Sequence, residues 1–351
     1  MLGTLAAFIV VFLITQVIFG TALSAFLIRV MAPIGLPAWT MMVLGVGLAP
    51  ALVALILHYL LWAWPGVPHS VAVLMVVVSF AGIAWRAGTG WNSLRATARG
   101  TSRWREDRSM ILFILCSLAF AVLTIVELLR FGLTEHDILE YGVQGGIFLR
   151  DMAIHYGPHR YDAASGFYYV GLHGFTFPLL FTWEGLLNPE AAQMNSPWVR
   201  ALTPFHAWLL VTLLWGIIRS VDRWLAVCFA LALGGAMGFY FLGTVYHLDS
   251  LRIFLFTSSA ALFVIVIQRP HPRAILLLAA VCGASASIHS LGAIMAVLMG
   301  GLLPFLMPGG WRERLLGTLR YVGVTLLAGG IHYPVDVLWG TGWIFKDIIW
   351  Y

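Results

Sequence analysis

"RSMILFILCSLAFAVLTIVELLRFGLTEHDILEY", residues 108–141, joins a long apolar run to an acidic stretch. The apolar part has about 20 residues, which is the length that an α-helix needs to cross a hydrocarbon core of roughly 30 Å. Six arginines and only two acidic residues lie between residues 86 and 108. Because an excess of basic residues marks the cytoplasmic side of a span, this stretch predicts a membrane-spanning helix whose acidic end faces outward.

The composition extends this prediction to the whole chain of 351 residues. It is 61% hydrophobic and 10% charged, with a mean hydropathy of +0.91, whereas soluble domains carry about 25% charged residues. The net charge of +5 comes from basic residues in short loops between apolar runs, so it reports membrane orientation and excludes nucleic acid as a partner. Three cysteines inside apolar runs, without CxxC spacing, are read as small buried hydrophobes. We therefore expect an all-α polytopic membrane protein.

Ten apolar segments are expected to span the membrane, and a basic loop, 86–108, is expected on the cytoplasmic side. The expected spans are 3–29, 38–64, 69–86, 109–131, 201–219, 224–245, 251–268, 274–289, 290–307 and 321–338.

The remaining basic loops fix the sidedness of the segments between them. Loops 219–223, 268–273 and 311–320 are basic and are therefore expected in the cytoplasm, so that residues 132–200 form one extracytoplasmic region. Within it, "FTFPLLFTWEGLL" (175–187) is too short for a span and contains Pro and Glu. We expect it to be an interfacial or re-entrant segment at the outer leaflet.

This organisation predicts three regions. Residues 1–108 hold the first spans and the basic loop, and residues 109–310 form the main transmembrane module with its outer loop. Residues 311–351 contribute a last span and an outer tail.

Ionisable side chains gather where this topology puts the outer ends of the spans. Charges at membrane depth cost about 2.5–3.5 kcal/mol on insertion scales and mark functional sites. The residues come from four places in the sequence and one side of the membrane: Asp137 and Glu140, then His173, then His247, Asp249 and Arg252, then His289.

The acidic stretch after the first quoted span has helical spacing. Asp137, Glu140, Tyr141 and Gln144 stand at i, i+3, i+4 and i+7, so in a helix they share one face. Two carboxylates on that face suit a general base and its hydrogen-bonding or metal partner. The alternative is a solvated first helical turn with Thr134 as its N-cap.

The other candidates also have two interpretations. Asp249 and Arg252 could form a structural ion pair at i, i+3, or Arg252 could bind a phosphate with its planar fork. His173 and His289 could be structural histidines or ligands. Together the histidines and carboxylates could hold a divalent cation, but none has the HExxH type of spacing, so no cofactor is assigned.

The order of these motifs resembles the GT-C superfamily of membrane glycosyltransferases, which includes protein O-mannosyltransferases and aminoarabinose transferases. The resemblance rests on "HDILEY" (136–141), "HGFTFPLLFTW" (173–183) and "HLDSLRIF" (247–254), and it covers roughly residues 110–310. In that family an acidic pair followed by Tyr opens the first outer loop, a stretch ending in Trp follows, and a second Asp comes later.

The resemblance implies an enzyme with a defined set of roles. Asp137 would be the base that activates the acceptor hydroxyl, with Glu140 and Asp249 as further carboxylates. Substrate would be bound by residues on the same face: Tyr141, His173, His247, Arg252 and His289.

The expected reaction is sugar transfer from a polyprenyl-phosphate donor to a hydroxyl of a glycan, lipid or protein acceptor. It would take place at the outer, periplasmic face of a cytoplasmic (inner) membrane. Two alternatives remain at this stage: a transporter or flippase that uses the same charged residues, and a non-catalytic membrane scaffold subunit. Transport favours charges near the bilayer midplane and broken helices in matching halves, whereas these charges lie toward one face.

Overall fold

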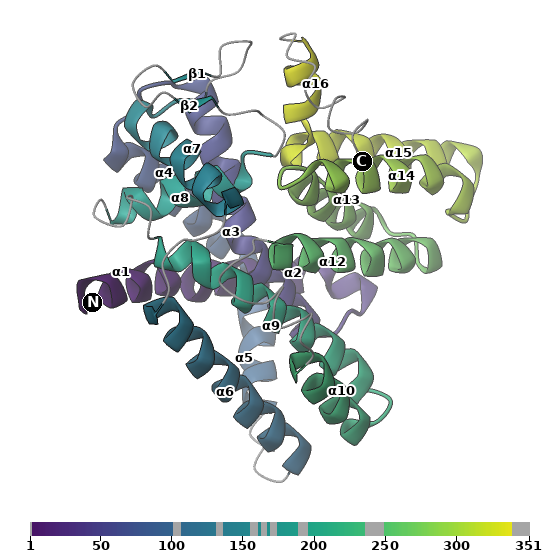
Figure 1. Ribbon diagram of the computed structural model, residues 1–351. Coiled ribbons are helices and arrows are strands. Elements are labelled where there is room, and N and C mark those ends of the chain that lie inside the picture. Colours follow the sequence, from purple (N-terminus) through teal and green to yellow (C-terminus); the bar gives the residue numbers. More distant parts are fainter. Residues whose placement is uncertain are drawn as a thin grey trace. The chain divides into compact units, whose positions relative to one another are not determined.

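The protein is helical throughout the part that the computed structural model describes (Figure 1). That part comprises residues 2–100, 107–130, 136–154, 161–162, 167–168, 174–188, 196–235 and 249–338. Within it the only strands are β1 (Tyr161–Asp162) and β2 (Phe167–Tyr168), which pair antiparallel. The all-α class predicted from composition is confirmed.

The chain divides into two compact units whose segments interleave along the sequence. Unit 1 contains 1–50, 77–139 and 187–254, and unit 2 contains 51–76, 140–186 and 255–351. The three regions predicted from the sequence stay a prediction.

The helices of unit 1 are given first, followed by those that cross the boundary between the two units. Unit 1 holds α1 (Leu2–Phe12), the π-helix η1 (Leu13–Phe19), α2 (Gly20–Met31), the 3₁₀ turn η2 (Ala32–Ile34), α5 (Gly90–Gly100), α6 (Arg108–Arg130), α9 (Pro197–Arg219) and α10 (Arg223–Gly235). The division passes through α3 (Ala38–Ala63), α4 (His69–Ala87), α7 (His136–Asp151) and α12 (Asp249–Gln268).

Unit 2 holds the remaining elements. They are α8 (Thr176–Leu187), α13 (Pro272–Ala286), α14 (Ser290–Leu306), α15 (Trp311–Thr325), the π-helix η4 (Leu326–Gly330) and α16 (His332–Leu338), together with the two strands.

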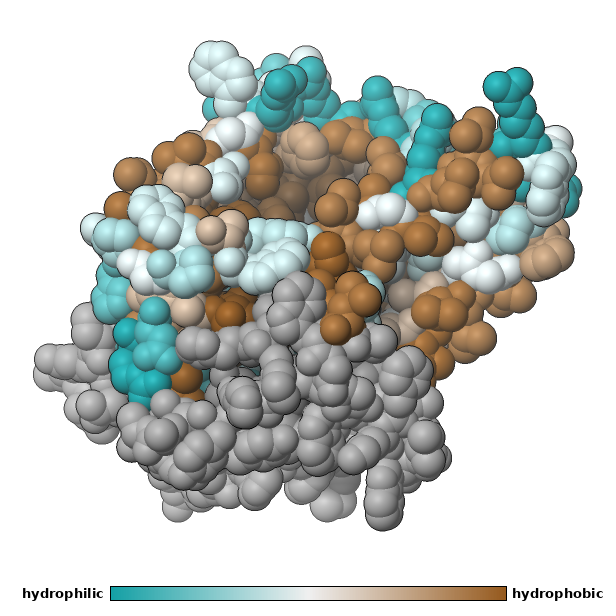
Figure 2. All heavy atoms as spheres, turned by 90° about the horizontal axis from the view of Figure 1, so that it is seen from above, coloured by the Kyte–Doolittle hydropathy of each residue, from teal (hydrophilic) through white to brown (hydrophobic). Residues whose placement is uncertain are grey.

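Six helical segments within the described residues are long and apolar enough to cross a membrane. They are Phe8–Ile34, Ala38–Ala63, His69–Ala87, Arg108–Val126, Pro197–Arg219 and Asp249–Gln268. Shorter apolar helices occupy three more of the expected spans. Apolar side chains cover much of the described surface in Figure 2 (brown), as expected where lipid tails replace water as the solvent. The protein is therefore membrane-embedded, and the count of ten spans remains a prediction.

Two buried side chains of α9, Trp198 and His206, bond to other helices inside unit 1. The indole Nε1 of Trp198 on α9 donates to Oε1 of Gln16 at 2.8 Å, and both residues are buried. His206, further along α9, contacts the backbone oxygens of Leu202 and Gly47 at 2.7 and 3.0 Å. In an apolar interior such bonds are needed, because an unsatisfied polar group costs several kcal/mol in hydrocarbon.

Glycine permits the close packing of α2 on α3. A Cβ added at Gly45 would lie 2.5 Å from the backbone nitrogen of Ser24. The Ser24 hydroxyl also lies 3.1 Å from the carbonyl oxygen of Met42. Small residues that let two backbones approach are typical of helix pairs in membranes, where packing replaces the hydrophobic driving force.

In unit 2, α13, α14 and α15 lie side by side (Figure 1, green to yellow). A Cβ at Gly283 of α13 would lie 2.6 Å from the carbonyl oxygen of Thr325 on α15, so glycine is required for this approach. The Tyr321 hydroxyl donates across the group to the carbonyl oxygen of Ala296 on α14 at 2.8 Å.

The last expected span, 321–338, differs from the structure. The helix begins ten residues earlier, at Trp311, and is interrupted at Gly329, whose φ of 136° lies outside the range that other residues adopt readily. A short helix, α16, follows and contains Pro334. Hydropathy averages over this break, since the residues around it, Leu326–Gly330, are apolar or small.

The segment 175–187, expected to be an interfacial or re-entrant segment, is helical and buried, and its place relative to the membrane stays a prediction. It forms α8, in which ten consecutive residues, Thr176 to Gly185, are buried. Its aromatic rings, including Phe177, Phe181 and Trp183, lie inside the protein and not on its surface.

Candidate functional site

The acidic motif lies on α7, which begins at His136. Asp137, Glu140 and Tyr141 are therefore in helical backbone and share one face, as the spacing predicted. Tyr141 and Gln144 on that face are both 6% exposed. The side chains of Asp137 and Glu140, and Thr134 as a possible N-cap, lie outside the described residues.

The buried face of α7 packs against α8. The rings of Tyr141 and Phe177 are 5.4 Å apart, and the Thr182 hydroxyl donates to the carbonyl oxygen of Gly145 at 3.1 Å. A Cβ at Gly145 would lie 2.6 Å from the carbonyl oxygen of Pro178, so glycine lets the two helices meet. The first and second sequence motifs are thus in direct contact.

The second motif also contacts the segment around His289. The backbone N–H of Thr176 donates to the carbonyl oxygen of Ser287 at 3.2 Å, and the two hydroxyl oxygens lie 2.6 Å apart. Because the Ser287 hydroxyl donates its own proton to the carbonyl oxygen of Ala284, the Thr176 hydroxyl is the donor between the two. At Gly174 an added Cβ would lie 1.6 Å from the Ser287 carbonyl oxygen.

His289 caps the N-terminus of α14. Its Nδ1 accepts the backbone N–H of Leu291 at 3.1 Å, and the residue is 8% exposed. This is a structural role, since the ring satisfies one of the helix's first amide groups. The Nδ1 contact fixes the orientation of the ring at the start of α14, two residues after Ser287.

Asp249 and Arg252 form an ion pair in unit 1. Their atoms Oδ1 and Nη2 are 2.6 Å apart, and the side chains are 34% and 22% exposed. The i, i+3 pair on α12 is therefore formed, and it neutralises the arginine that was considered as a phosphate ligand. A pair of this exposure contributes little to stability.

Two predicted site residues, His173 and His247, lie outside the described residues. Among the others, Tyr141, the segment from Gly174 to Trp183 and His289 belong to unit 2, and the pair of Asp249 and Arg252 belongs to unit 1.

An aromatic cluster beside this junction was missed in the sequence. Phe175 lies between His58 of α3 and His332 of α16, with ring centroids 5.5 and 4.7 Å away, and Phe148 of α7 packs at 5.6 Å. The two histidines are 3% and 1% exposed. Each interrupts an apolar run, and a polar residue inside such a run is the signal that could have indicated them.

Glu184 is a second residue that sequence reasoning did not select. It lies on α8 and is 0% exposed, which is rare for a carboxylate. Its position in an apolar segment was noted only as an interruption of a span. A carboxylate kept at such a position is expected to be functional or paired.

Within the described residues no three His, Cys, Asp or Glu side chains come together as a metal site. The residues that remain for a cation, Asp137, Glu140, His173 and His247, have side chains outside the described part.

Comparisons with known proteins found no match: no family model fits the sequence, and neither curated proteins nor solved structures gave a similar chain.

Proposed function

We propose that this protein is a membrane glycosyltransferase that moves a sugar from a polyprenyl-phosphate donor to an acceptor hydroxyl. The observation that carries the proposal is the junction in unit 2. There α7, which bears the acidic motif, packs on α8, and α8 is bonded through Thr176 to Ser287, two residues before His289. Segments from three of the four places in the sequence selected for this chemistry are thus in contact.

Asp137 is proposed as the general base. The reaction needs a carboxylate about 3 Å from the acceptor hydroxyl, because the proton must leave as the oxygen attacks the sugar. Glu140, one helical turn further along α7, would accept a hydrogen bond from the acceptor substrate. Tyr141 fixes the rotation of α7 through its packing against Phe177.

Positive groups are needed where the leaving phosphate develops charge. His173, His247 and Arg252 are proposed for this role. Arg252 would have to exchange its contact with Asp249 for the phosphate, which its planar fork permits. The resemblance also implies Asp249 as a further carboxylate of the reaction.

The embedded, apolar character of the protein supports a lipid-linked donor. A donor with a polyprenyl tail is delivered within the bilayer and needs a protein whose helices face lipid, as these do. The outer face of a cytoplasmic membrane is the proposed side of the reaction, because the basic loops mark the opposite side.

The test uses the full-length protein in proteoliposomes with a panel of radiolabelled polyprenyl-phosphate sugars. Transfer to an acceptor lipid, glycan or peptide is measured for the unchanged protein, Asp137→Asn and the neighbouring Glu135→Gln. We expect Asp137→Asn to abolish transfer while the variant keeps its thermal transition, and Glu135→Gln to retain transfer. Full transfer by Asp137→Asn rules out the proposed base.

A transporter remains the second candidate, favoured by the break at Gly329, since broken helices are typical of transporters. The same proteoliposomes separate the two functions. Accumulation of an unmodified labelled sugar lipid in the opposite leaflet, without transfer, would favour transport and contradict the enzyme.

A further inference from the structure

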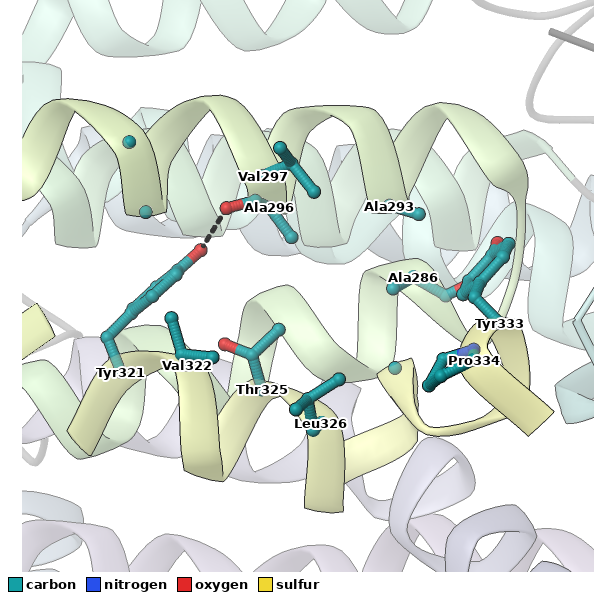
Figure 3. A pocket seen from close by; sticks show the side chains of 13 residues that line it. Ala286, Ala293, Ala296, Val297, Tyr321, Val322, Thr325, Leu326, Tyr333 and Pro334 are labelled. Carbon is teal, nitrogen blue, oxygen red and sulfur yellow. Dashed lines mark hydrogen bonds between the residues drawn. The ribbon is translucent and has the colours of Figure 1, made fainter. Parts of the chain in front are cut away.

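An apolar pocket of about 510 Å³ lies in unit 2, on α14, α15 and the start of α16 (Figure 3). Its volume falls in the range of roughly 300–1,000 Å³ that is usual for small-molecule sites. The α14 wall is made of small residues, including Ala293, Ala296, Gly300 and Gly301. A Cβ added at Gly301 would meet nothing within 4 Å, so the space beside it is open.

The polar groups that border the pocket are already bonded within the protein. The hydroxyls of Tyr321 and Tyr333, at its two ends in Figure 3, donate to the carbonyl oxygens of Ala296 and Ala286, each at 2.8 Å. The Thr325 hydroxyl donates to the carbonyl oxygen of Ala279 at 3.3 Å. The pocket therefore offers its occupant apolar contact and little hydrogen bonding, which suits a hydrocarbon chain.

The side chains at the pocket's edge are apolar and exposed. Val297 on α14 is 73% exposed, and Val322 and Leu326 facing it are 43% and 39% exposed. In a membrane-embedded protein such a surface is covered by lipid tails. The chain that fills the pocket can accordingly enter sideways from the bilayer.

The helix that carries Tyr321, at one end of the pocket, begins at a basic turn. The stretch "WRERLLGTLR" (311–320) opens α15 with three arginines and one glutamate. Arg314 precedes Tyr321 by seven residues, so both stand on one face of α15, about 10 Å apart along the helix. The Arg314 Nε donates to the carbonyl oxygen of Gly309 at 2.9 Å, which holds its guanidinium at the turn between α14 and α15.

We propose that this pocket binds one acyl chain of an anionic glycerophospholipid, whose phosphate lies against Arg314. Charge complementarity selects the occupant, because basic clusters at the cytoplasmic end of spans attract anionic headgroups. Trp311, three residues before Arg314 on α15, is 66% exposed, which is typical of a tryptophan at the level of the headgroups. This site is independent of the proposed transfer reaction.

The test measures lipid binding to the purified, delipidated full-length protein by native mass spectrometry. Phosphatidylglycerol and phosphatidylcholine with identical acyl chains are titrated separately. We expect one phosphatidylglycerol to bind with about tenfold higher affinity than phosphatidylcholine, which corresponds to roughly 1.4 kcal/mol. Arg314→Gln should remove this preference. Equal binding of the two lipids by the unchanged protein overturns the proposal.

A matched pair of glycines tests the pocket itself. Gly301→Phe places a ring in the open space, whereas Gly323→Phe does the same at a glycine of α15 that is also open but does not line the pocket. We expect about tenfold weaker phosphatidylglycerol binding for Gly301→Phe and no change for Gly323→Phe. Ala293→Leu fills less of the pocket than Gly301→Phe and should also weaken phosphatidylglycerol binding.

Three outcomes contradict the proposal. Unchanged binding by Gly301→Phe and Ala293→Leu would show that the lipid lies elsewhere. Equal weakening by Gly323→Phe would show a general loss of lipid affinity. Polyprenyl phosphate that displaces phosphatidylglycerol at equimolar concentration would identify a different occupant. If the glycine variants do not fold, the comparison of the two phospholipids on the unchanged protein decides.

Discussion

The hydroxyl oxygens of Thr176 and Ser287 lie 2.6 Å apart although 111 positions separate them in the chain. The contact is buried, and it joins α8 to the turn between α13 and α14. It holds the second sequence motif against the segment that contains His289. Together with the bond from the Thr176 backbone N–H to the Ser287 carbonyl oxygen, it joins the two segments in an apolar interior.

Thr176→Val tests this bond. The change keeps the shape of the side chain and removes the hydroxyl that donates to Ser287. We expect a loss of only about 1–2 kcal/mol in stability, because the Ser287 hydroxyl keeps its bond to the carbonyl oxygen of Ala284. Thermal unfolding in detergent measures it. Thr212→Val is the control, since its hydroxyl only bonds back to its own helix at Trp208. A double variant with Ser287→Ala should lose less than the sum of the two single changes, and full additivity would deny the coupling.

Gly174→Ala should prevent the second motif from docking. The added Cβ would overlap the carbonyl oxygen of Ser287 at 1.6 Å, and backbone atoms cannot move aside cheaply. We expect poor expression or a lowered melting temperature. Gly146→Ala is the control, because a Cβ there meets nothing within 4 Å and alanine favours the helix by about 0.5–1 kcal/mol. Equal melting temperatures for the two variants would contradict the close approach.

Phe175→Ala should be strongly destabilising. The ring fills the space between His58, His332 and Phe148, and truncating a buried Phe costs about 3–5 kcal/mol. Phe305→Ala is the matched control, since that ring is 72% exposed. Chemical unfolding of both variants in the same micelles gives the comparison. A loss for Phe175→Ala no larger than for Phe305→Ala would show that the cluster does not support the fold.

Asp107 gives a pH dependence outside the membrane spans. Its carboxylate accepts bonds from the side chain and backbone of Ser109 and from Arg219, which lower its pKa to about 2. The stabilisation is complete above the unfolded-state pKa of roughly 3.9 and is lost as pH falls toward 2. Asp107→Asn should thus lower the melting temperature equally at pH 7 and pH 5. The difference should shrink below about pH 4.

The same pair predicts the outcome of a change at Arg219. Arg219→Gln removes the smaller part of the effect, because Ser109 is the first cause of the lowered pKa. We expect a smaller fall in melting temperature than for Asp107→Asn, measured side by side at pH 7. A larger fall would show that the ion pair with Arg219, and not the bonds from Ser109, is the main contribution.

The membrane class and most of the helices followed from the sequence, because an apolar run of about 20 residues is a local property that solvent and backbone hydrogen bonding decide without any partner. Helical spacing likewise placed Asp137, Glu140 and Tyr141 on one face of α7. The break at Gly329 was not predicted, since hydropathy does not report a single positive φ.

Contacts between distant segments were decided only by the tertiary structure. The sequence selected His289 and the segment 173–183 separately, but only packing put Ser287 beside Thr176 and buried the aromatic rings of α8 inside the protein. Packing also brought His58, Phe175 and His332 together from three separate parts of the chain. Such contacts depend on how helices approach each other, and that approach is set by glycines such as Gly145 and Gly174, whose role is visible only beside their neighbours.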